Sequence, residues 1–163
     1  MSAGESHCAA LTQSKKVYLW GNGSYGRLGT GFEFTNLSPI NVDDFDQLDI
    51  VKISCGAFHT LILGRDGSVY SFGHNKYGKL GTKEDIIFKA IYTQVVPYKC
   101  SDSVDNKVKI GLDHKNNGFF KMIEAGYNHS LVVNSKGKVY SWGYAGLGLL
   151  GRDNRETFQN VPL

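Results

Sequence analysis

The chain has 163 residues, of which 41% are hydrophobic and 20% charged, and its formal net charge at neutral pH is +3. That length is sufficient for one domain with its own core, and no apolar run approaches the roughly 18 residues of a membrane-spanning helix. A charge this small points to a nucleic-acid or membrane partner only where it is concentrated on one surface.

The first unit of the chain introduces a pattern that the rest repeats. Gly4-Glu5-Ser6-His7 precedes an apolar stretch at 8–11, a polar turn, and the run Val17-Tyr18-Leu19-Trp20-Gly21. Tyr25-Gly26-Arg27-Leu28-Gly29 follows, and Pro39 comes 19 residues after Trp20. Short apolar runs between polar turns are typical of β-strands, and a proline belongs on an edge strand because it donates no ladder hydrogen bond. We expect four strands here, the last at an outer edge.

The second unit repeats this order 52 residues later, with Gly56-Ala57-Phe58-His59, Val69-Tyr70-Ser71-Phe72-Gly73 and Tyr77-Gly78-Lys79-Leu80-Gly81. Before it, Val51, Ile53 and Cys55 alternate with Lys52 and Ser54, which predicts a half-buried strand. After it, the segment 84–91 leaves a strand and a short helix open, and Pro97 marks an edge strand.

The third unit lies 70 residues further on, with Gly126-Tyr127-Asn128-His129, Val139-Tyr140-Ser141-Trp142-Gly143, Leu147-Gly148-Leu149-Leu150-Gly151 and finally Pro162. In every unit the histidine lies 13 residues before the aromatic residue, so internal spacing is constant while the connections vary. Such a period is typical of a propeller or solenoid, in which each unit buries its faces against its neighbours. We assign units to about 1–42, 50–98 and 120–163, with an insertion at about 83–119.

The repeated string Gly-x-x-His-(Thr/Ser), then Val-Tyr-Ser-(Trp/Phe)-Gly-x-x-x-x-Gly-x-Leu-Gly, closely resembles the regulator of chromosome condensation repeat over 4–29, 50–81 and 120–151. Neither the Gly-Gly doublet of kelch repeats nor the Trp-Asp of WD repeats occurs in it. The resemblance implies an all-β fold, a partial β-propeller with about three four-stranded antiparallel blades of seven. Lys15 in place of the turn glycine, Phe72 in place of tryptophan and Leu147 in place of tyrosine depart from the pattern.

The residues that recur in each unit are interpreted as the structural core of the repeat. The histidines are expected to be buried and bonded to backbone, since one per blade does not make a zinc cluster, and the aromatic residues should be equivalent and buried between blades. We therefore predict no catalytic residue, metal or cofactor. The set comprises His7, Trp20, Gly21, Gly26, Gly29, His59, Phe72, Gly73, Gly78, Gly81, His129, Trp142, Gly143, Gly148 and Gly151.

Function is expected in residues that do not recur, and the hairpin tips between second and third strands are the first such set. They carry Lys15, Lys16, Arg65, Lys136 and Lys138, with Asp66 as their one acid. Gathered on one face, these residues would form a basic rim for DNA, a histone or an acidic protein. Ordinary solvated turn charge is the alternative.

The second such set lies in the segments between blades. Asp43, Asp44 and Asp46 form an acidic stretch interleaved with apolar residues, and the 83–119 insertion contains Lys107, Lys109 and Asp113. Long loops that leave a rigid scaffold are common binding elements, although a solvent-exposed connector would have the same sequence pattern.

These features favour a protein-interaction module that presents inter-strand loops to a protein partner. The alternative implied by the resemblance is guanine-nucleotide exchange on a Ran-type small GTPase, and chromatin association through the tips is compatible with either. No membrane partner is expected. Further blades or self-association should cover the apolar flanks. Cys8, Cys55 and Cys100 form no even framework or CxxC pair, so reduced thiols and a nuclear or cytoplasmic location are expected.

Overall fold

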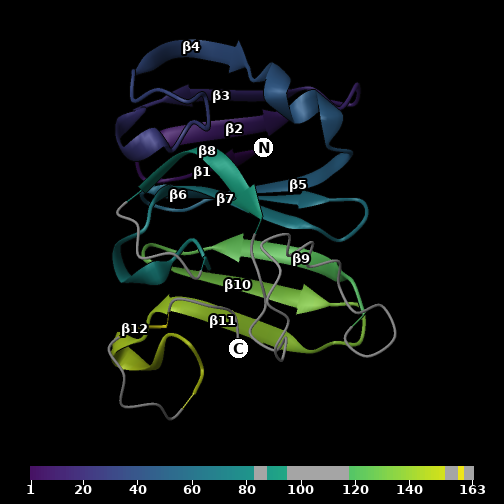
Figure 1. The fold of residues 1–163 in the computed structure, drawn as a ribbon, viewed down its shortest axis with the longest axis vertical. Coiled ribbons are helices and arrows are strands. Elements are labelled where there is room, and N and C mark those ends of the chain that lie inside the picture. The colour runs from purple at the N-terminus through teal and green to yellow at the C-terminus, as the bar shows by residue number, and fades with distance from the viewer. Residues whose placement is uncertain (83–87, 95–117, 153–157, 160–163) are drawn as a thin grey trace, which may run out of the picture.

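The computed structural model describes residues 1–82, 88–94, 118–152 and 158–159, and this part of the chain forms three four-stranded antiparallel sheets (Figure 1). The first sheet contains β1 (Ser2–Ala3), β2 (His7–Leu11), β3 (Val17–Gly21) and β4 (Asn36–Asn41). The second contains β5 (Ile50–Cys55), β6 (His59–Gly64), β7 (Val69–His74) and β8 (Phe88–Gln94). The third contains β9 (Phe120–Ala125), β10 (His129–Asn134), β11 (Val139–Tyr144) and β12 (Phe158–Gln159).

Each sheet is a meander in which strands adjacent in sequence are adjacent in space. This is the arrangement of a propeller blade, so the predicted all-β fold with three four-stranded blades is confirmed. Pro39 lies exposed in the edge strand β4, as expected, whereas Pro97 and Pro162 lie outside the described residues. The sequence left both a strand and a short helix possible at 84–91, and the structure shows that residues 88–91 belong to strand β8.

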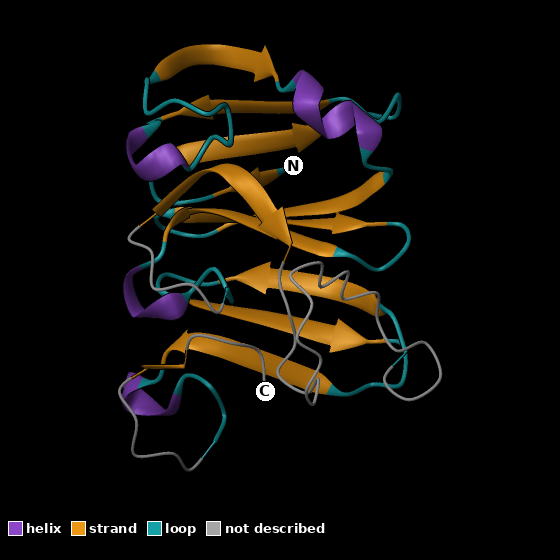
Figure 2. Cartoon of the chain, in the orientation of Figure 1, coloured by secondary structure: helices purple, strands orange, loops and turns teal. Residues whose placement is uncertain are grey.

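The three blades are stacked in sequence order, with the first at the top of Figure 1 and the third at the bottom. Contacts of β5 with β1 and β2, and of β9 with β5 and β6, join neighbouring blades. Short 3-10 helices η1 (Ser24–Gly26), η3 (Lys76–Gly78) and η4 (Gly146–Gly148) follow the third strands, at the left in Figure 2, and η2 (Asp43–Gln47) lies at the opposite side. No helix in the described segments is long and apolar enough to cross a membrane.

The ends of the strands therefore define two faces of the stack. One face, called the turn face, carries η1, η3 and η4 together with the loop between the first and second strands of each blade. In the first blade, His7 pairs with Gly21 at this end of the strands. The tip face carries the β2–β3, β6–β7 and β10–β11 hairpins together with η2.

Each blade boundary contains its own apolar core. Between the first two blades, buried residues include Leu19, Leu28, Phe45, Ile62 and Phe72, and between the last two they include Leu61, Leu63, Val132, Tyr140 and Trp142. All six residues of β6 are buried, whereas burial in β2 and β10 is incomplete. A middle strand is thus buried on both sides only where its blade has two neighbours.

One strand differs from its predicted pattern. Alternation in β5 predicts that Val51 is buried and Ser54 exposed, but Val51 is exposed and Ser54 is buried. A β-bulge between Ile50 and Lys52 shifts the register against β6, so the alternation does not run through the whole strand. Ser54 also faces the third blade, where its hydroxyl accepts a bond from the Ala125 amide.

The three motif aromatics are not equally buried, which corrects the prediction for Trp20. Phe72 and Trp142 are fully buried, whereas Trp20 is only partly buried. The difference arises because the motif aromatic side chain points toward the preceding blade. The Trp142 indole Nε1 donates to the Lys79 carbonyl in the second blade at 2.8 Å, and Phe72 stacks on Phe45 at 5.5 Å. Nothing in the described part of the chain precedes the first blade, so Trp20 is open on that side.

This difference predicts unequal effects of truncation. Trp142→Ala should lower the free energy of unfolding by roughly 3–5 kcal/mol, because it removes a fully buried aromatic ring and leaves a cavity. Trp20→Ala, the matched control, should cost less, because its side chain is already partly exposed to solvent. Urea unfolding followed by circular dichroism measures both. Equal costs for the two variants would contradict the blade-to-blade direction of the side chain.

Candidate functional site

The repeated histidines link blades through a hydroxyl group. His7 Nε2 lies 2.8 Å from Thr60 Oγ1 of the second blade, and that hydroxyl donates to the Arg27 carbonyl at 2.8 Å. The second boundary repeats the arrangement: His59 Nε2 lies 2.9 Å from Ser130 Oγ, which donates to the Lys79 carbonyl at 2.9 Å. Because each hydroxyl proton is used on a carbonyl, the imidazole Nε2–H must be the donor to the hydroxyl.

This relay differs in one respect from the predicted backbone bond. The imidazole reaches the backbone through a side chain of the next blade, so the residue after each motif histidine is part of the contact. His7 and His59 are each bonded across their own blade boundary. No group of three metal-ligand side chains occurs in the described residues.

Burial determines the charge state of these imidazoles. Desolvation, reinforced by the Arg27 guanidinium, lowers the pKa of His7 to about 4. Burial and the Lys79 ammonium hold the pKa of His59 well below its usual value, and burial also lowers the pKa of His129. The relay therefore operates with neutral rings, in which one nitrogen donates.

Two glycines allow the blades to approach at the inner strands. A Cβ on Gly4 would lie 2.2 Å from the Gly56 carbonyl oxygen, and one on Gly56 would lie 2.5 Å from the Gly126 oxygen. The same positions would collide with the rings of His7 and His59. The Gly-x-x-His pattern is thus explained by space, since the glycine leaves room for the imidazole and for the next blade.

Sequence reasoning missed a pair of serines with an equivalent role. Ser2 Oγ accepts a bond from the Cys55 amide at 2.9 Å, and Ser54 Oγ accepts one from the Ala125 amide at 2.9 Å. Ser2 and Ser54 are offset by the same 52 residues as the motifs, and this offset is the signal that could have identified them. The next position in the series is Glu124, whose carboxylate instead pairs with Lys52 at 2.9 Å.

The turns contain residues with left-handed backbone conformation at fixed positions. Lys15 has φ 67°, close to the values of Gly67 and Gly137, so it adopts the turn conformation that glycine adopts in the other blades. Tyr25, Tyr77 and Leu147 also have positive φ, which the sequence did not suggest. Positive φ is found at the repeat glycines too: Gly21, Gly26, Gly29, Gly73, Gly78, Gly81, Gly143, Gly148 and Gly151.

The tip face brings the predicted basic tips together with the predicted acidic segment. Lys16 is paired with Asp46, and Arg65 Nε lies 2.6 Å from Asp49 Oδ2. Asp43 and Asp44 lie exposed in the same short helix η2. The rim is therefore of mixed charge and not simply basic, because the connector between the first two blades crosses this face. Lys107, Lys109 and Asp113 lie outside the described residues.

An aromatic side chain anchors this acidic connector. Phe45 is almost completely buried, and its ring stacks on Phe72 of the second blade with a centroid distance of 5.5 Å and an interplanar angle of 26°. The interleaved apolar residue thus fixes η2 between the blades, while Asp43, Asp44 and Asp46 remain exposed to solvent.

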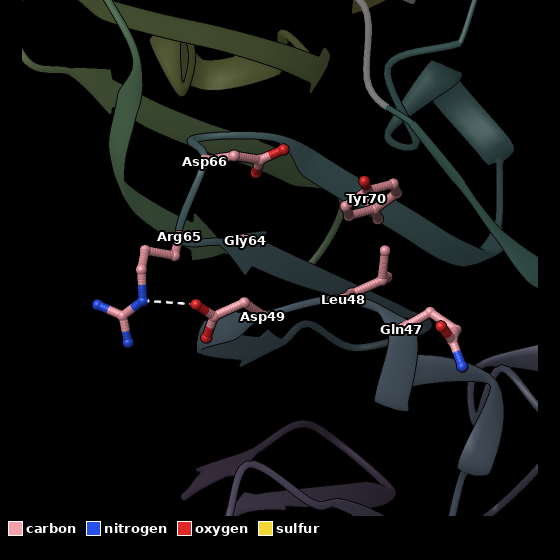
Figure 3. Close-up of a pocket in the computed structure, with 7 residues that line it drawn as sticks. All are labelled: Gln47, Leu48, Asp49, Gly64, Arg65, Asp66 and Tyr70. Carbon is pink, nitrogen blue, oxygen red and sulfur yellow. Dashed lines mark hydrogen bonds and ion pairs between the residues drawn. The ribbon is translucent and has the colours of Figure 1, made fainter.

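A pocket of about 400 Å³ lies beside η2 on the tip face (Figure 3). Leu48 and Tyr70 point toward its interior, and the Arg65–Asp49 ion pair borders it. Gln47, Gly64 and Asp66 complete the lining. Asp66 is engaged locally, because its carboxylate accepts from the Ser68 amide and hydroxyl.

The third blade contributes the remaining predicted tip residues. Lys136 and Lys138 are exposed, and their amides both donate to Asn134 Oδ1, which holds the hairpin in shape. The Lys138 ammonium lies 4.8 Å from the centroid of the Tyr140 ring.

Comparison with protein families gives matches to two sequence models with one description. Both describe the Regulator of chromosome condensation (RCC1) repeat; one matches residues 15–63 and 66–133, and the other matches 1–27, 50–79 and 121–148.

Curated relatives and solved structures agree with this description. The chain is 30% identical over 154 residues to the Ultraviolet-B receptor UVR8 of Arabidopsis thaliana, covering 94% of this chain and 31% of that protein. It is 33% identical over 159 residues to human Protein RCC2, covering 92% of this chain and 30% of RCC2. Prp20p of Saccharomyces cerevisiae, a structure described with its binding to Gsp1p and histones, has a TM-score of 0.76 at 26% identity and matches 98% of this chain and 36% of its own. The chain thus spans about a third of the length of these proteins.

The neutral histidines predict a specific loss of stability in acid. At pH below 6.5 the unfolded chain binds a proton at His7, whereas the folded chain does so only near pH 4. The contribution of neutral His7 to the free energy of unfolding is therefore fully present above pH 6.5. It is lost as the pH drops toward 4, and the loss is on the order of 3 kcal/mol. Urea unfolding at pH 7.5, 6.0 and 5.0 measures the slope.

His7→Gln is the informative variant, because an amide can still donate to Thr60 but does not titrate. It should lower stability at pH 7.5 and show a shallower fall between pH 6.5 and 5 than the unmodified chain. Parallel pH profiles for the two proteins would show that His7 is not held neutral by the fold.

Proposed function

Because the chain belongs to the regulator of chromosome condensation (RCC1) repeat family, we propose that it is a protein-interaction module that presents its tip face to a protein partner. The observation that carries this proposal is the mixed-charge rim beside a pocket on that face that contains two large apolar side chains. Tyr70 and Leu48 offer apolar surface within a border of the Arg65–Asp49 pair and the η2 carboxylates.

The division of labour among residues supports this assignment. The repeated polar groups are occupied in bonds between blades, as the relay from His59 through Ser130 to the Lys79 carbonyl illustrates. Residues that vary from blade to blade lie at the ends of the strands, where a rigid scaffold presents them to solvent. The chain is similar in sequence both to the Ultraviolet-B receptor UVR8 and to RCC2, and fold alone does not choose among partners.

The charge pattern favours a protein over DNA as the partner. A DNA-binding surface needs an uninterrupted positive stripe, because its affinity comes largely from phosphate neutralisation. Here the Lys16–Asp46 and Arg65–Asp49 pairs interrupt that stripe. Complementary charges of both signs around an apolar centre are typical of protein interfaces. We place this interaction in the nucleus or cytoplasm.

Cross-linking from the pocket tests the proposal. A photo-reactive residue in place of Gln47, which lines the pocket, should cross-link a discrete protein in extract. The same group in place of Leu37, which is 95% exposed on edge strand β4, is the control and should not yield this product. Identical products from both positions would place the interaction elsewhere on the molecule.

Charge reversal at the tips should weaken the binding of that partner. Replacing Lys15, Lys16, Lys136 and Lys138 by Glu should lower affinity by about tenfold or more, because it reverses the steering potential and sets a carboxylate against Asp46. The fold should persist, since exposed surface substitutions usually change stability by less than about 0.5 kcal/mol each. Isothermal titration with the cross-linked partner measures the loss.

The control for this prediction is Lys121→Glu, which changes an exposed lysine of β9 outside the hairpin tips. It should leave the affinity unchanged. Loss of binding that is equal in this variant and in the tip variant would indicate a nonspecific charge effect. Chromatin association through the tips would appear instead as affinity for any duplex DNA that falls steeply between 50 and 200 mM salt.

Guanine-nucleotide exchange on a Ran-type small GTPase is the second candidate, favoured by the likeness to Prp20p, whose structure is described with its binding to Gsp1p. Exchange is catalysis by binding and needs no covalent catalytic residue. Release of a fluorescent GDP analogue from such a GTPase decides between the candidates. Acceleration that is selective for one GTPase and sensitive to salt would identify an exchange factor, whereas an unchanged release rate leaves the interaction module.

A further inference from the structure

The turn face carries an aromatic cluster centred on Phe58. Ring centroids of Tyr127, His74 and Tyr25 lie 5.7, 6.1 and 6.4 Å from that of Phe58, all nearly perpendicular to it. Tyr25 also stacks on His74 at 4.3 Å. Tyr127 is 58% exposed and Tyr25 38% exposed, so the cluster reaches the surface. We call Tyr25, Phe58, His74 and Tyr127 the aromatic cluster.

Phe58 occupies a position at which the three units differ. The residue before the motif histidine is Ser6 in the first unit, Phe58 in the second and Asn128 in the third. In the first blade this position serves a cation, because Ser6 Oγ accepts from Arg27 Nη1 at 2.7 Å. In the second blade the equivalent cation is Lys79, and it meets an aromatic ring where Arg27 meets a hydroxyl.

Two cations consequently lie against one ring. The Lys79 ammonium is 5.5 Å and the Arg27 guanidinium 4.9 Å from the Phe58 centroid. Arg27 is satisfied by three acceptors, the Ser24 carbonyl, Ser6 and the Ala57 carbonyl. Lys79 is fully buried, and within the described part of the chain its Nζ has no hydrogen-bond partner. A buried ammonium with no carboxylate is an exception that calls for an anion.

The charges around Lys79 also favour the binding of an anion. Burial, Lys76 and Arg27 lower the pKa of Lys79 to about 8, so its neighbours repel its charge. Among the described acids, Glu5 stabilises the charged form of Arg27 through its negative charge, and the Glu33 carboxylate accepts a hydrogen bond from the Tyr25 amide. Neither carboxylate is bonded to Lys79. An anionic group placed on the aromatic cluster would therefore meet a positive potential that the fold leaves uncompensated.

We propose that the aromatic cluster is a docking site for an acidic segment of a protein partner, with a side-chain carboxylate seated above Lys79. The proposal rests on the proposed interaction function and adds a second face to it. Aromatic ring edges are electropositive and tyrosine hydroxyls donate hydrogen bonds, so Tyr25 and Tyr127 suit a carboxylate. Tyrosine and arginine are also enriched among residues that dominate interface affinity.

The ring geometry favours a peptide over single-stranded nucleic acid. A stacking base needs an open ring face. In the aromatic cluster the rings meet edge to face around Phe58, and Tyr25 is already stacked on His74. Carboxylates approach ring edges and hydroxyls, and both tyrosines of the cluster are exposed.

A blocked, fluorescein-labelled hexaglutamate peptide is the probe, and fluorescence anisotropy with the full chain measures its binding. Lys79→Met removes the buried charge while keeping an unbranched apolar side chain, and Tyr127→Ser changes an exposed residue that the fold does not depend on. Each should weaken peptide binding by about tenfold. In ¹³C-lysine-labelled protein, saturating peptide should raise the pKa of Lys79, because a carboxylate favours the ammonium form.

Lys121→Met is the control, because Lys121 is an exposed lysine of β9 that belongs neither to the aromatic cluster nor to the hairpin tips. It should leave peptide affinity unchanged. Absence of hexaglutamate binding, equal loss in Lys121→Met, or equally tight binding of hexathymidylate would each overturn the proposal. If the partner cross-linked through Gln47 still binds while hexaglutamate does not, the aromatic-cluster site alone is wrong and the tip-face function stands.

Discussion

The stack of blades depends on a hydrogen-bond relay that crosses each boundary and returns. An imidazole of one blade donates to a hydroxyl of the next, and that hydroxyl donates back to a carbonyl of the first, as in His59, Ser130 and Lys79. Buried polar groups are costly unless paired, so each relay is satisfied only when two blades are in register. The relay thus specifies how blades meet, while the apolar cores around Phe72 and Trp142 supply most of the burial.

The carbonyl at the end of the relay explains why the turn after each third strand has a constant shape. The Lys79 carbonyl accepts from both Ser130 and the Trp142 indole, so the backbone of this turn must be held in one position. Left-handed conformations at Tyr77 and Gly78 lead the chain into that position. The side chain of residue 79 is then free to vary, and Arg27, Lys79 and Leu149 occupy equivalent places. A rigid backbone with variable side chains gives the turn face its capacity to differ between blades.

The period of the sequence was sufficient to predict the strands, their order in each blade and the edge position of Pro39. It was not sufficient for properties that depend on which blade stands beside which. Trp20 matches the motif but is only partly buried, because burial of this side chain is provided by the preceding blade. The tips were expected to be basic, yet Asp46 and Asp49 pair with them, since the path of the connector cannot be read from spacing. Ser2 and Ser54 were missed because serine is common, although their 52-residue offset matches the repeat.

Among the described residues, the outer sides of the first and third blades differ in the chemistry that a neighbouring sheet would have to supply. On the third blade, a hydroxyl would complete a relay from His129, and apolar side chains would cover Val139 and Leu147, which are 57% and 97% exposed. On the first blade, the position that holds Thr60 and Ser130 elsewhere holds Cys8, and a thiol is a weaker hydrogen-bond partner than a hydroxyl. A histidine facing Cys8 would therefore be held less firmly than His7 or His59. If another sheet packs on the first blade, apolar packing on Trp20 and Tyr18 would contribute more to that association than the relay.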